Sequence, residues 1–266
     1  MIKSVFFDID GTLISFKTHK MPESTKLALK KLREKGVKLF IATGRSPFAI
    51  PVVKHLLDFE FDGYVMLNGQ YCVIDNKVIR DTPLPKEAFK SILPYMEENK
   101  IACEFLELDY TYSNLVNERV LELRKFLGNT VSTFPIENPY RAEKGGTYQL
   151  CAYIKNHEEE EFFENMPGCR GVRWNPLFVD VIPENGGKGM GIKAILDYLE
   201  FSKDEAMAFG DGGNDIEMLE FVKYGVAMGN SGENVKKSAA YVTDDVDSDG
   251  IYHLSLIHIS EPTRPY

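Results

Sequence analysis

Short apolar runs alternate with amphipathic stretches along the first part of this chain. The first run is Ile2 to Phe7, and the next is Val37 to Ala42. Short runs of this kind are typical of strands that are covered on both faces of a sheet. Between them, Pro22 to Lys35 places leucines among Lys and Glu residues, and Gly36 lies just past its end. The pattern predicts a strand, a helix and a second strand, in that order.

The same alternation continues on both sides of a different middle segment. After the second strand we expect a helix through Val53 and Leu57, a strand at Tyr64 to Leu67, and a hairpin at Tyr71 to Arg80. After Pro183 the predicted elements are, in order, helix Gly189–Leu199, strand Ala206–Phe209, helix Asp215–Phe221, strand Tyr224–Met228 and strand Tyr241–Thr243. Strands that are separated by helices predict a parallel, doubly wound sheet.

The middle segment mixes helices with strands that look more exposed. Its predicted elements are helices Lys86–Asn99, Asn117–Leu127 and Glu158–Asn165, and strands Tyr148–Ile154 and Phe178–Ile182. We therefore predict an α/β fold, with a Rossmann-like core of residues 1–82 and 184–266 and an inserted α+β cap of residues 83–183. A closing helix is expected near Ile251. The segment Ser260 to Tyr266 contains prolines and no amphipathic pattern, so it is left out of the fold prediction.

Composition and charge narrow the class of protein. With 266 residues, 44% of them hydrophobic, the chain can bury a substantial core, and its net charge of −9 argues against binding to nucleic acid or an anionic membrane. The four cysteines form no Cys-x-x-Cys pair, so we expect neither a zinc site nor a disulfide framework. No signal region or bilayer-length apolar run is visible, which predicts a cytoplasmic protein. The oligomeric state stays open between a monomer and a weak homodimer.

Candidate chemistry gathers where the predicted strands end. Asp8 and Asp10 follow the first strand, Thr43 follows the second, Lys188 begins a helix, and Gly210–Asp215 follows a later strand. Because ligands bind beyond the carboxyl ends of strands in open α/β sheets, we expect these side chains to lie together. Carboxylates at such a site repel one another unless a cation lies between them. Mg²⁺ fits this set, since it prefers oxygen ligands and commonly bridges to a substrate phosphate.

These residues resemble the four motifs of the haloacid dehalogenase superfamily. The matching segments are Asp8-x-Asp10-Gly11-Thr12, Thr43-Gly44-Arg45, Lys188 and Gly210-Asp211-Gly-Gly-Asn214-Asp215. The chain is most similar to the Cof-type sugar-phosphate phosphatases, which carry a large α/β cap of type IIB between the second and third motifs. The resemblance extends from Lys3 to about Ile251, and four motifs in the right order make it specific.

The resemblance implies a role for each motif residue. Asp8 is expected to be the nucleophile that forms an aspartyl-phosphate. Asp10 is expected to protonate the leaving alcohol and then to activate the hydrolytic water. Thr43 is expected to bind the phosphoryl group, and Lys188 to hold Asp8 and the phosphate.

The metal and the substrate are assigned in the same way. The resemblance implies that Mg²⁺ is bound by Asp8, the Asp10 carbonyl oxygen and Asp211, with support from Asp215. The residues expected at the phosphate or substrate are Gly44, Arg45, Asn68 and Asn214. The pairing of Arg45 with a nearby acid remains an alternative for that residue.

The resulting hypothesis is a Mg²⁺-dependent phosphatase that acts on small phosphorylated metabolites, with hexose phosphates favoured. A phosphotransferase or sugar phosphomutase that shares the aspartyl-phosphate is the alternative among enzymes. A non-catalytic sensor of phosphorylated ligands is the alternative outside them. In the cap, Tyr148 and Trp174 could stack on a sugar, but buried packing is the favoured interpretation for each. Asp180 could contact a hydroxyl or point outward.

Overall fold

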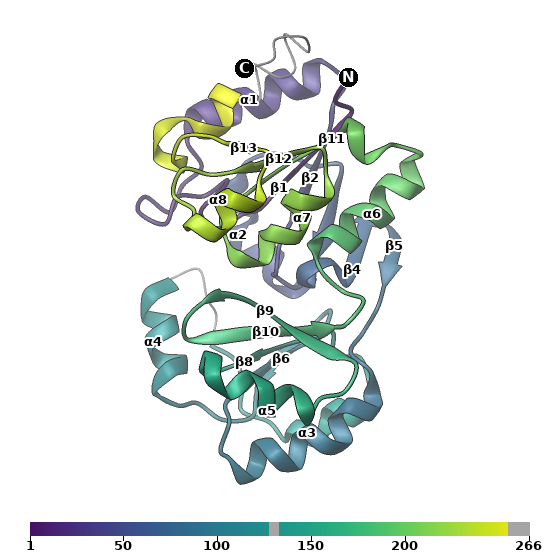
Figure 1. The fold of residues 1–266 in the computed structure, drawn as a ribbon, viewed down its shortest axis with the longest axis vertical. Coiled ribbons are helices and arrows are strands. Elements are labelled where there is room, and N and C mark those ends of the chain that lie inside the picture. Colours follow the sequence, from purple (N-terminus) through teal and green to yellow (C-terminus); the bar gives the residue numbers. More distant parts are fainter. Residues whose placement is uncertain (128–132, 255–266) are drawn as a thin grey trace. The chain divides into compact units, whose positions relative to one another are not determined.

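The computed structural model describes residues 1–127 and 133–254 of the chain, and they divide into two compact units (Figure 1). The first unit comprises Met1–Thr43, Lys54–Arg80 and the chain from Gly187 onward. The second comprises Gly44–Val53 and Asp81–Gly186. The N-terminal and C-terminal parts of the chain therefore build one unit together, and the middle part builds the other.

The first unit is built on a mixed sheet. Among the described residues this sheet has eight strands, in the order β13-β12-β11-β1-β2-β3-β4-β5. The strands are β1 (Ser4–Phe7), β2 (Lys38–Ala42), β3 (Gly63–Met66), β4 (Tyr71–Ile74), β5 (Lys77–Asp81), β11 (Ala206–Gly210), β12 (Tyr224–Ala227) and β13 (Tyr241–Val242). All pairings from β13 across to β3 are parallel, whereas β4 runs antiparallel to β3. Strand β1 lies in the middle, and the chain winds outward from it in both directions.

Helices cover both faces of this sheet. They are α1 (Glu23–Glu34), α2 (Ile50–Leu57), α6 (Lys188–Leu199), α7 (Ile216–Phe221) and α8 (Glu233–Ser238). Figure 1 shows α7 and α8 in front of the sheet, where they pack with α6 on a buried face that includes Phe6 and Phe40. Phe7 points to the other face and stacks on Phe209, with ring centroids 5.3 Å apart. Both faces of β1 are therefore buried, as its apolar sequence predicts.

The second unit has a sheet and a core of its own. Its described strands form a five-stranded sheet in the order β7-β6-β8-β10-β9. The elements are α3 (Lys86–Glu98), β6 (Cys103–Leu106), β7 (Thr111–Ser113), α4 (Glu118–Leu127), β8 (Gln149–Ala152), α5 (Glu159–Glu164), β9 (Cys169–Asn175) and β10 (Phe178–Pro183). The pairings of β6, β8, β9 and β10 are antiparallel.

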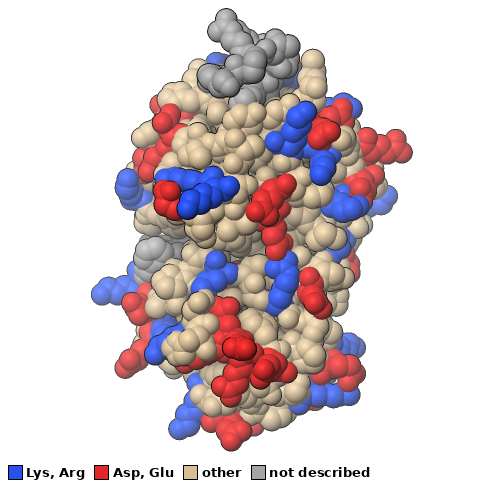
Figure 2. Space-filling view, in the orientation of Figure 1, with Lys and Arg blue, Asp and Glu red and all other residues tan. Residues whose placement is uncertain are grey.

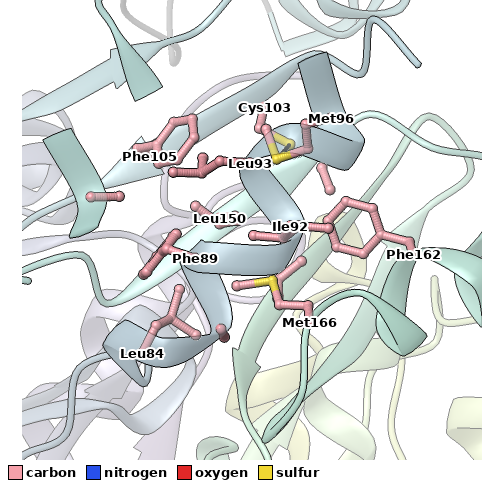
Figure 3. Close-up of a cluster of buried hydrophobic side chains, with 14 of the residues drawn as sticks. Leu84, Phe89, Ile92, Leu93, Met96, Cys103, Phe105, Leu150, Phe162 and Met166 are labelled. Carbon is pink, nitrogen blue, oxygen red and sulfur yellow. Dashed lines mark hydrogen bonds between the residues drawn. The ribbon is translucent and has the colours of Figure 1, made fainter. Parts of the chain in front are cut away.

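Helix α3 places its apolar face on this sheet. Phe89, Ile92, Leu93 and Met96 recur at the spacing of one helix face and are all buried (Figure 3). They pack in one cluster with Leu150 of β8 and with residues from β6, β10 and α5. All residues of this buried cluster belong to the second unit, so that unit has a core of its own.

The predicted fold class is confirmed: a doubly wound α/β core with an inserted α+β segment. Most predicted elements are present, with ends that differ by a few residues. The strands β6, β7 and β9 and the helix α8 were not predicted. The predicted closing helix corresponds to helical residues 250–254, and the segment Ser260 to Tyr266 lies outside the described residues.

Two general properties bear on partners. In the part of the chain that the structure describes, no helix has both the length and the apolar character needed to cross a bilayer. Figure 2 shows Lys and Arg side chains interspersed with Asp and Glu over the visible face. That face presents no broad basic surface of the kind that binds nucleic acid.

Candidate active site

The carboxyl ends of three neighbouring strands supply the candidate site. Strand β1 lies between β11 and β2, and Asp8 follows it directly. The Asp8 amide donates to the Phe209 carbonyl oxygen (3.0 Å), which carries the β1–β11 pairing to the end of the strand. Asp211 follows β11, and Thr43 follows β2. The parallel register therefore brings these residues to one edge of the sheet.

Lys188 is the first residue of α6 and is fully buried. Its Nζ lies 2.6 Å from Asp8 Oδ1 and 2.6 Å from Asp215 Oδ1. A buried ammonium needs such partners, because losing hydration without compensation costs several kcal/mol. The fold brings Asp8 and Asp215 together although they are far apart in the chain, and Lys188 contacts both.

Asp215 organises the loop that follows β11. Its Oδ2 accepts hydrogen bonds from the amides of Asp211 and Gly212, each at 2.9 Å. Its other oxygen accepts from Lys188, and the residue is fully buried. Asp215 therefore fixes the position of Asp211 while it holds the lysine.

Three carboxylates form a cluster that fits a metal ion. Among the described residues, one ligand oxygen each from Asp8, Asp211 and Asp215 lie within 4.8 Å of one another. The hydroxyl of Thr12 donates to Asp211 Oδ1 (2.8 Å) and fixes that side chain. Lys188 supplies one positive charge to the three carboxylates. The donor set is all oxygen and carries excess negative charge, which suits a hard divalent cation.

Burial and the neighbouring carboxylates raise the pKa values of Asp8 and Asp211 in this cluster. Burial raises the pKa of Asp8 from 3.8 to about 7; Lys188 opposes this rise, and the carboxylates of Asp215 and Asp10 add to it. Burial also raises the pKa of Asp211 well above its ordinary value, and the charges of Asp8 and Asp215 add to the effect. The pKa of Lys188 is raised, because Asp215 and Asp8 together outweigh its burial. A bound cation would favour the ionised form of both acids.

The loop after Asp8 turns sharply at Gly11. This residue has φ of +92°, and a Cβ built on it would lie 2.3 Å from Asp211 Oδ2. Both the conformation and the space therefore require glycine. The carbonyl oxygen of Gly11 accepts from Asn230 Nδ2 (2.9 Å), which ties the loop that contains Asp10 to the turn after β12. Asp10 itself is half-buried.

The turn Leu67–Gly69 after β3 is the most unusual backbone of the site. Leu67, Asn68 and Gly69 have φ of 53°, 50° and 94°. A left-handed residue other than glycine costs about 1–3 kcal/mol and persists where its surroundings hold it. The Asn68 side chain accepts from Asn214 Nδ2 (3.0 Å), and both residues were predicted to contact substrate or phosphate.

The structure brings most of the predicted site residues into the first unit. Asp8, Lys188, Asp211 and Asp215 contact or adjoin one another, and Asn68 contacts Asn214. Thr43 is buried and linked to Asn68, whose amide donates to the Thr43 carbonyl oxygen (3.0 Å). Gly44 and Arg45 instead group with the second unit, where the Gly44 carbonyl oxygen accepts from Gln149 Nε2 (3.4 Å).

Three residues of the site were not assigned a role from the sequence: Thr12, Gln70 and Asn230. Thr12 orients Asp211, Asn230 holds Gly11, and Gln70 Oε1 accepts from the Gly187 amide (3.3 Å). Thr12 lies in the Asp8–Thr12 motif and Asn230 follows the predicted strand Tyr224–Met228, so the position of each in the sequence pointed to the site. Gln70 is a buried polar residue beside a predicted turn and had none.

Comparisons with known proteins extend over both units. A sequence model of the family described as haloacid dehalogenase-like hydrolase matches residues 5–254. One relative is YkrA of Bacillus subtilis (strain 168), which is named as a phosphatase. Its sequence is 37% identical to this chain over 251 residues, which cover 94% of this chain and 95% of YkrA.

Solved structures agree with this relationship. One, described as a subclass IIB sugar phosphatase, has 38% sequence identity and a TM-score of 0.86, and covers 97% of this chain and 99% of that chain. A phosphatase structure from Bacteroides thetaiotaomicron has 35% identity and a TM-score of 0.88, with 98% and 96% of the two chains covered.

Proposed function

This chain belongs to the haloacid dehalogenase-like hydrolase family and is a phosphoric monoester hydrolase, and from this we propose its substrate and mechanism. We propose that it hydrolyses small sugar phosphates with Mg²⁺ through an aspartyl-phosphate. One observation carries the proposal. The buried ammonium of Lys188 holds Asp8 Oδ1 at 2.6 Å, beside the carboxylate of Asp211. Phosphoryl transfer depends on positioning and charge stabilisation, and this arrangement offers both.

In the proposed reaction Asp8 acts as a nucleophile. A carboxylate oxygen of Asp8 forms a bond to phosphorus while the bond from phosphorus to the leaving oxygen breaks. Asp10 gives its proton to that oxygen, so the alcohol leaves neutral. Asp10 then takes a proton from water, the water oxygen bonds to phosphorus, and the aspartyl-phosphate bond breaks to release inorganic phosphate. Lys188 favours the ionised, attacking form of Asp8.

The metal is assigned to the acidic cluster. Asp8, Asp211 and the Asp10 carbonyl oxygen would bind Mg²⁺, and Asp215 would support it through the loop that it organises. When bound, the ion supplies positive charge that offsets the negative charge of the phosphoryl oxygens. The excess of carboxylates over ammonium groups in the cluster supports this assignment.

Substrate choice is assigned to both parts of the chain. We assign phosphate contacts to Thr43, Gly44, Arg45 and Asn214, and selection of the sugar to residues 83–183. The high similarity to a structure described as a sugar phosphatase supports a sugar phosphate as the substrate class. The similarity covers nearly all of both chains, so it includes the inserted segment.

Release of inorganic phosphate tests the proposal. The purified protein is assayed with Mg²⁺ on sugar, nucleotide and cofactor phosphates, ranked by kcat/KM. We expect turnover that EDTA abolishes and that is fastest on hexose phosphates. Transfer of the phosphoryl group to a second sugar in place of water would indicate a phosphomutase. No turnover on any ester would contradict the enzymatic proposal and leave a sensor of phosphorylated ligands.

A further inference from the structure

The turn Leu67–Gly69 combines a strained backbone with a central place among the motif loops. Three consecutive residues have positive φ, and two of them are not glycine. All three are buried, with Asn68 only 1% exposed. Such a conformation persists only where surrounding contacts over-determine it. The contacts that hold Asn68 therefore indicate what the turn does.

Asn68 is hydrogen-bonded to three different loops. Its amide donates to the Thr43 carbonyl oxygen and its carbonyl oxygen accepts from the Gly187 amide, each at 3.0 Å. Its side-chain Oδ1 accepts from Asn214 Nδ2 at 3.0 Å. Gly187 directly precedes Lys188, and Asn214 directly precedes Asp215. One residue thus joins the chain after β2, the start of α6 and the loop after β11.

Close backbone packing fixes the distance between the turn and helix α6. A Cβ on Gly69 would lie 2.1 Å from the Gly187 carbonyl oxygen, so only glycine fits there. The Gly187 amide also points to Gln70 Oε1 (3.3 Å). The turn therefore holds the first residues of α6 by backbone contact, and Lys188 stands at that end.

We propose that Asn68 is a positioning residue, which sets Thr43, Lys188 and Asn214 relative to one another rather than binding the sugar. Its side-chain Oδ1 accepts a hydrogen bond from Asn214, and its backbone is hydrogen-bonded to Thr43 and Gly187. The inference rests on the proposed phosphatase function, because it assigns these three groups to the phosphate. Precise placement of reacting groups can be worth about 100-fold in rate for a shift of about 1 Å.

The test compares Asn68→Gly with Asn76→Gly. Both asparagines have left-handed φ, 50° and 63°, but Asn76 lies in the exposed turn between β4 and β5. Glycine is compatible with the left-handed φ at both positions, whereas Asn68→Gly also removes the oxygen that accepts from Asn214 Nδ2. We expect Asn68→Gly to lower kcat about 10- to 100-fold with KM within about 3-fold, and Asn76→Gly to match the wild type. A higher KM with unchanged kcat would overturn the inference, since it would make Asn68 a substrate contact.

A double variant and a readout without turnover complete the test. If Asn68 acts through Asn214, kcat of the double variant Asn68→Gly/Asn214→Ala should equal that of the less active single variant. If the two residues act independently, the fold-losses in kcat of the single variants should multiply. Hydrogen exchange of the Gly187 amide should be about 10-fold faster in Asn68→Gly than in Asn76→Gly. Unchanged exchange overturns the inference even if the wild type releases no phosphate. Absence of turnover in the wild type and Asn76→Gly alike would count against the proposed function alone.

Discussion

Asp8 carries a buried charge that the proposed mechanism requires and that burial disfavours. Its pKa is raised to about 7, chiefly by burial, even though Lys188 lies 2.6 Å away. Asp8→Asn removes the proposed nucleophile, so phosphate release should fall by at least about 10³-fold. The same change removes the unfavourable charge, so in EDTA at pH 8 it should raise the free energy of unfolding by about 1–2 kcal/mol.

Phosphate release and thermal unfolding of the same preparation measure both effects. Loss of activity together with a lower melting temperature would contradict this account, because it would indicate a damaged fold rather than a missing nucleophile. Asp10→Asn is the matched variant. It should also abolish turnover, because Asp10 is the proposed proton donor to the leaving oxygen.

Glu104 is a second buried carboxylate, in the second unit, and it gives that unit a pH dependence. Burial raises its pKa, against the opposing effects of Arg124 at 3.5 Å and of Tyr153. A raised folded-state pKa means that the folded form binds the proton more tightly, so stability is full below pH 4.5 and falls as pH rises through the folded pKa. Glu104→Gln should remove this loss. We expect it to melt above the wild type at pH 8 and together with it near pH 4; equal melting temperatures at both pH values would refute the prediction.

At the scale of secondary structure, the sequence predicted the elements that carry the motifs better than those of the inserted segment. Strands β1, β2 and β11 are short apolar runs buried on both faces, and this environment leaves a clear signal in composition. Strand β9 lies at a sheet edge, is mostly half-buried, and contains a glycine and two arginines, so its pattern is weak. Strand β7, with three residues, is too short for a period to show.

The candidate site divides in the same way. The four motifs could be placed at strand ends from the sequence, because parallel strands end at one edge of the sheet. The contact between Asn68 and Asn214 could not, since it joins residues 146 positions apart and depends on a left-handed turn at Leu67 and Asn68. A leucine in that conformation is not favoured by its own propensity, so only the packed fold determines it.

A glycine-to-alanine substitution in helix α6 should lower stability, whereas the same substitution inside most helices raises it. Alanine in place of an interior helical glycine usually adds about 0.5–1 kcal/mol of stability. A Cβ on Gly191, however, would lie 2.5 Å from Val65 Cγ1 and 2.8 Å from Gly69 Cα. Gly191→Ala should therefore lower the free energy of unfolding by about 1–3 kcal/mol and reduce kcat, because it pushes α6 away from the turn.

Denaturant unfolding of Gly191→Ala measures this change. Lys193→Ala on the same helix is the control, since that side chain is exposed and loses only its pair with Asp197 (2.6 Å), worth about 0.3–0.5 kcal/mol. A gain of stability in Gly191→Ala would mean that α6 and the turn are not in close contact.

At the scale of the whole molecule, the proposed Mg²⁺ would link the site to the stability of the first unit. The protein has a net charge of −9, and three of its carboxylates lie within one small cluster with Lys188 as a counter-charge. A ligand that binds only the folded form stabilises it by about 2.7 kcal/mol at 100 times its dissociation constant. Mg²⁺ should therefore raise the melting temperature of the unit that contains Asp8 and Asp211, and EDTA should reverse the rise.

The matched variant is Asp211→Asn, which removes one carboxylate and keeps an oxygen acceptor for Thr12. It should melt at or above the wild type in EDTA, because the pKa of Asp211 is raised by burial and by its acidic neighbours. It should also lose most of the response to Mg²⁺. The second unit has a separate core, so Glu104→Gln should keep the full response. A Mg²⁺ response that survives Asp211→Asn would place the metal outside the acidic cluster and contradict the mechanism proposed for Asp8.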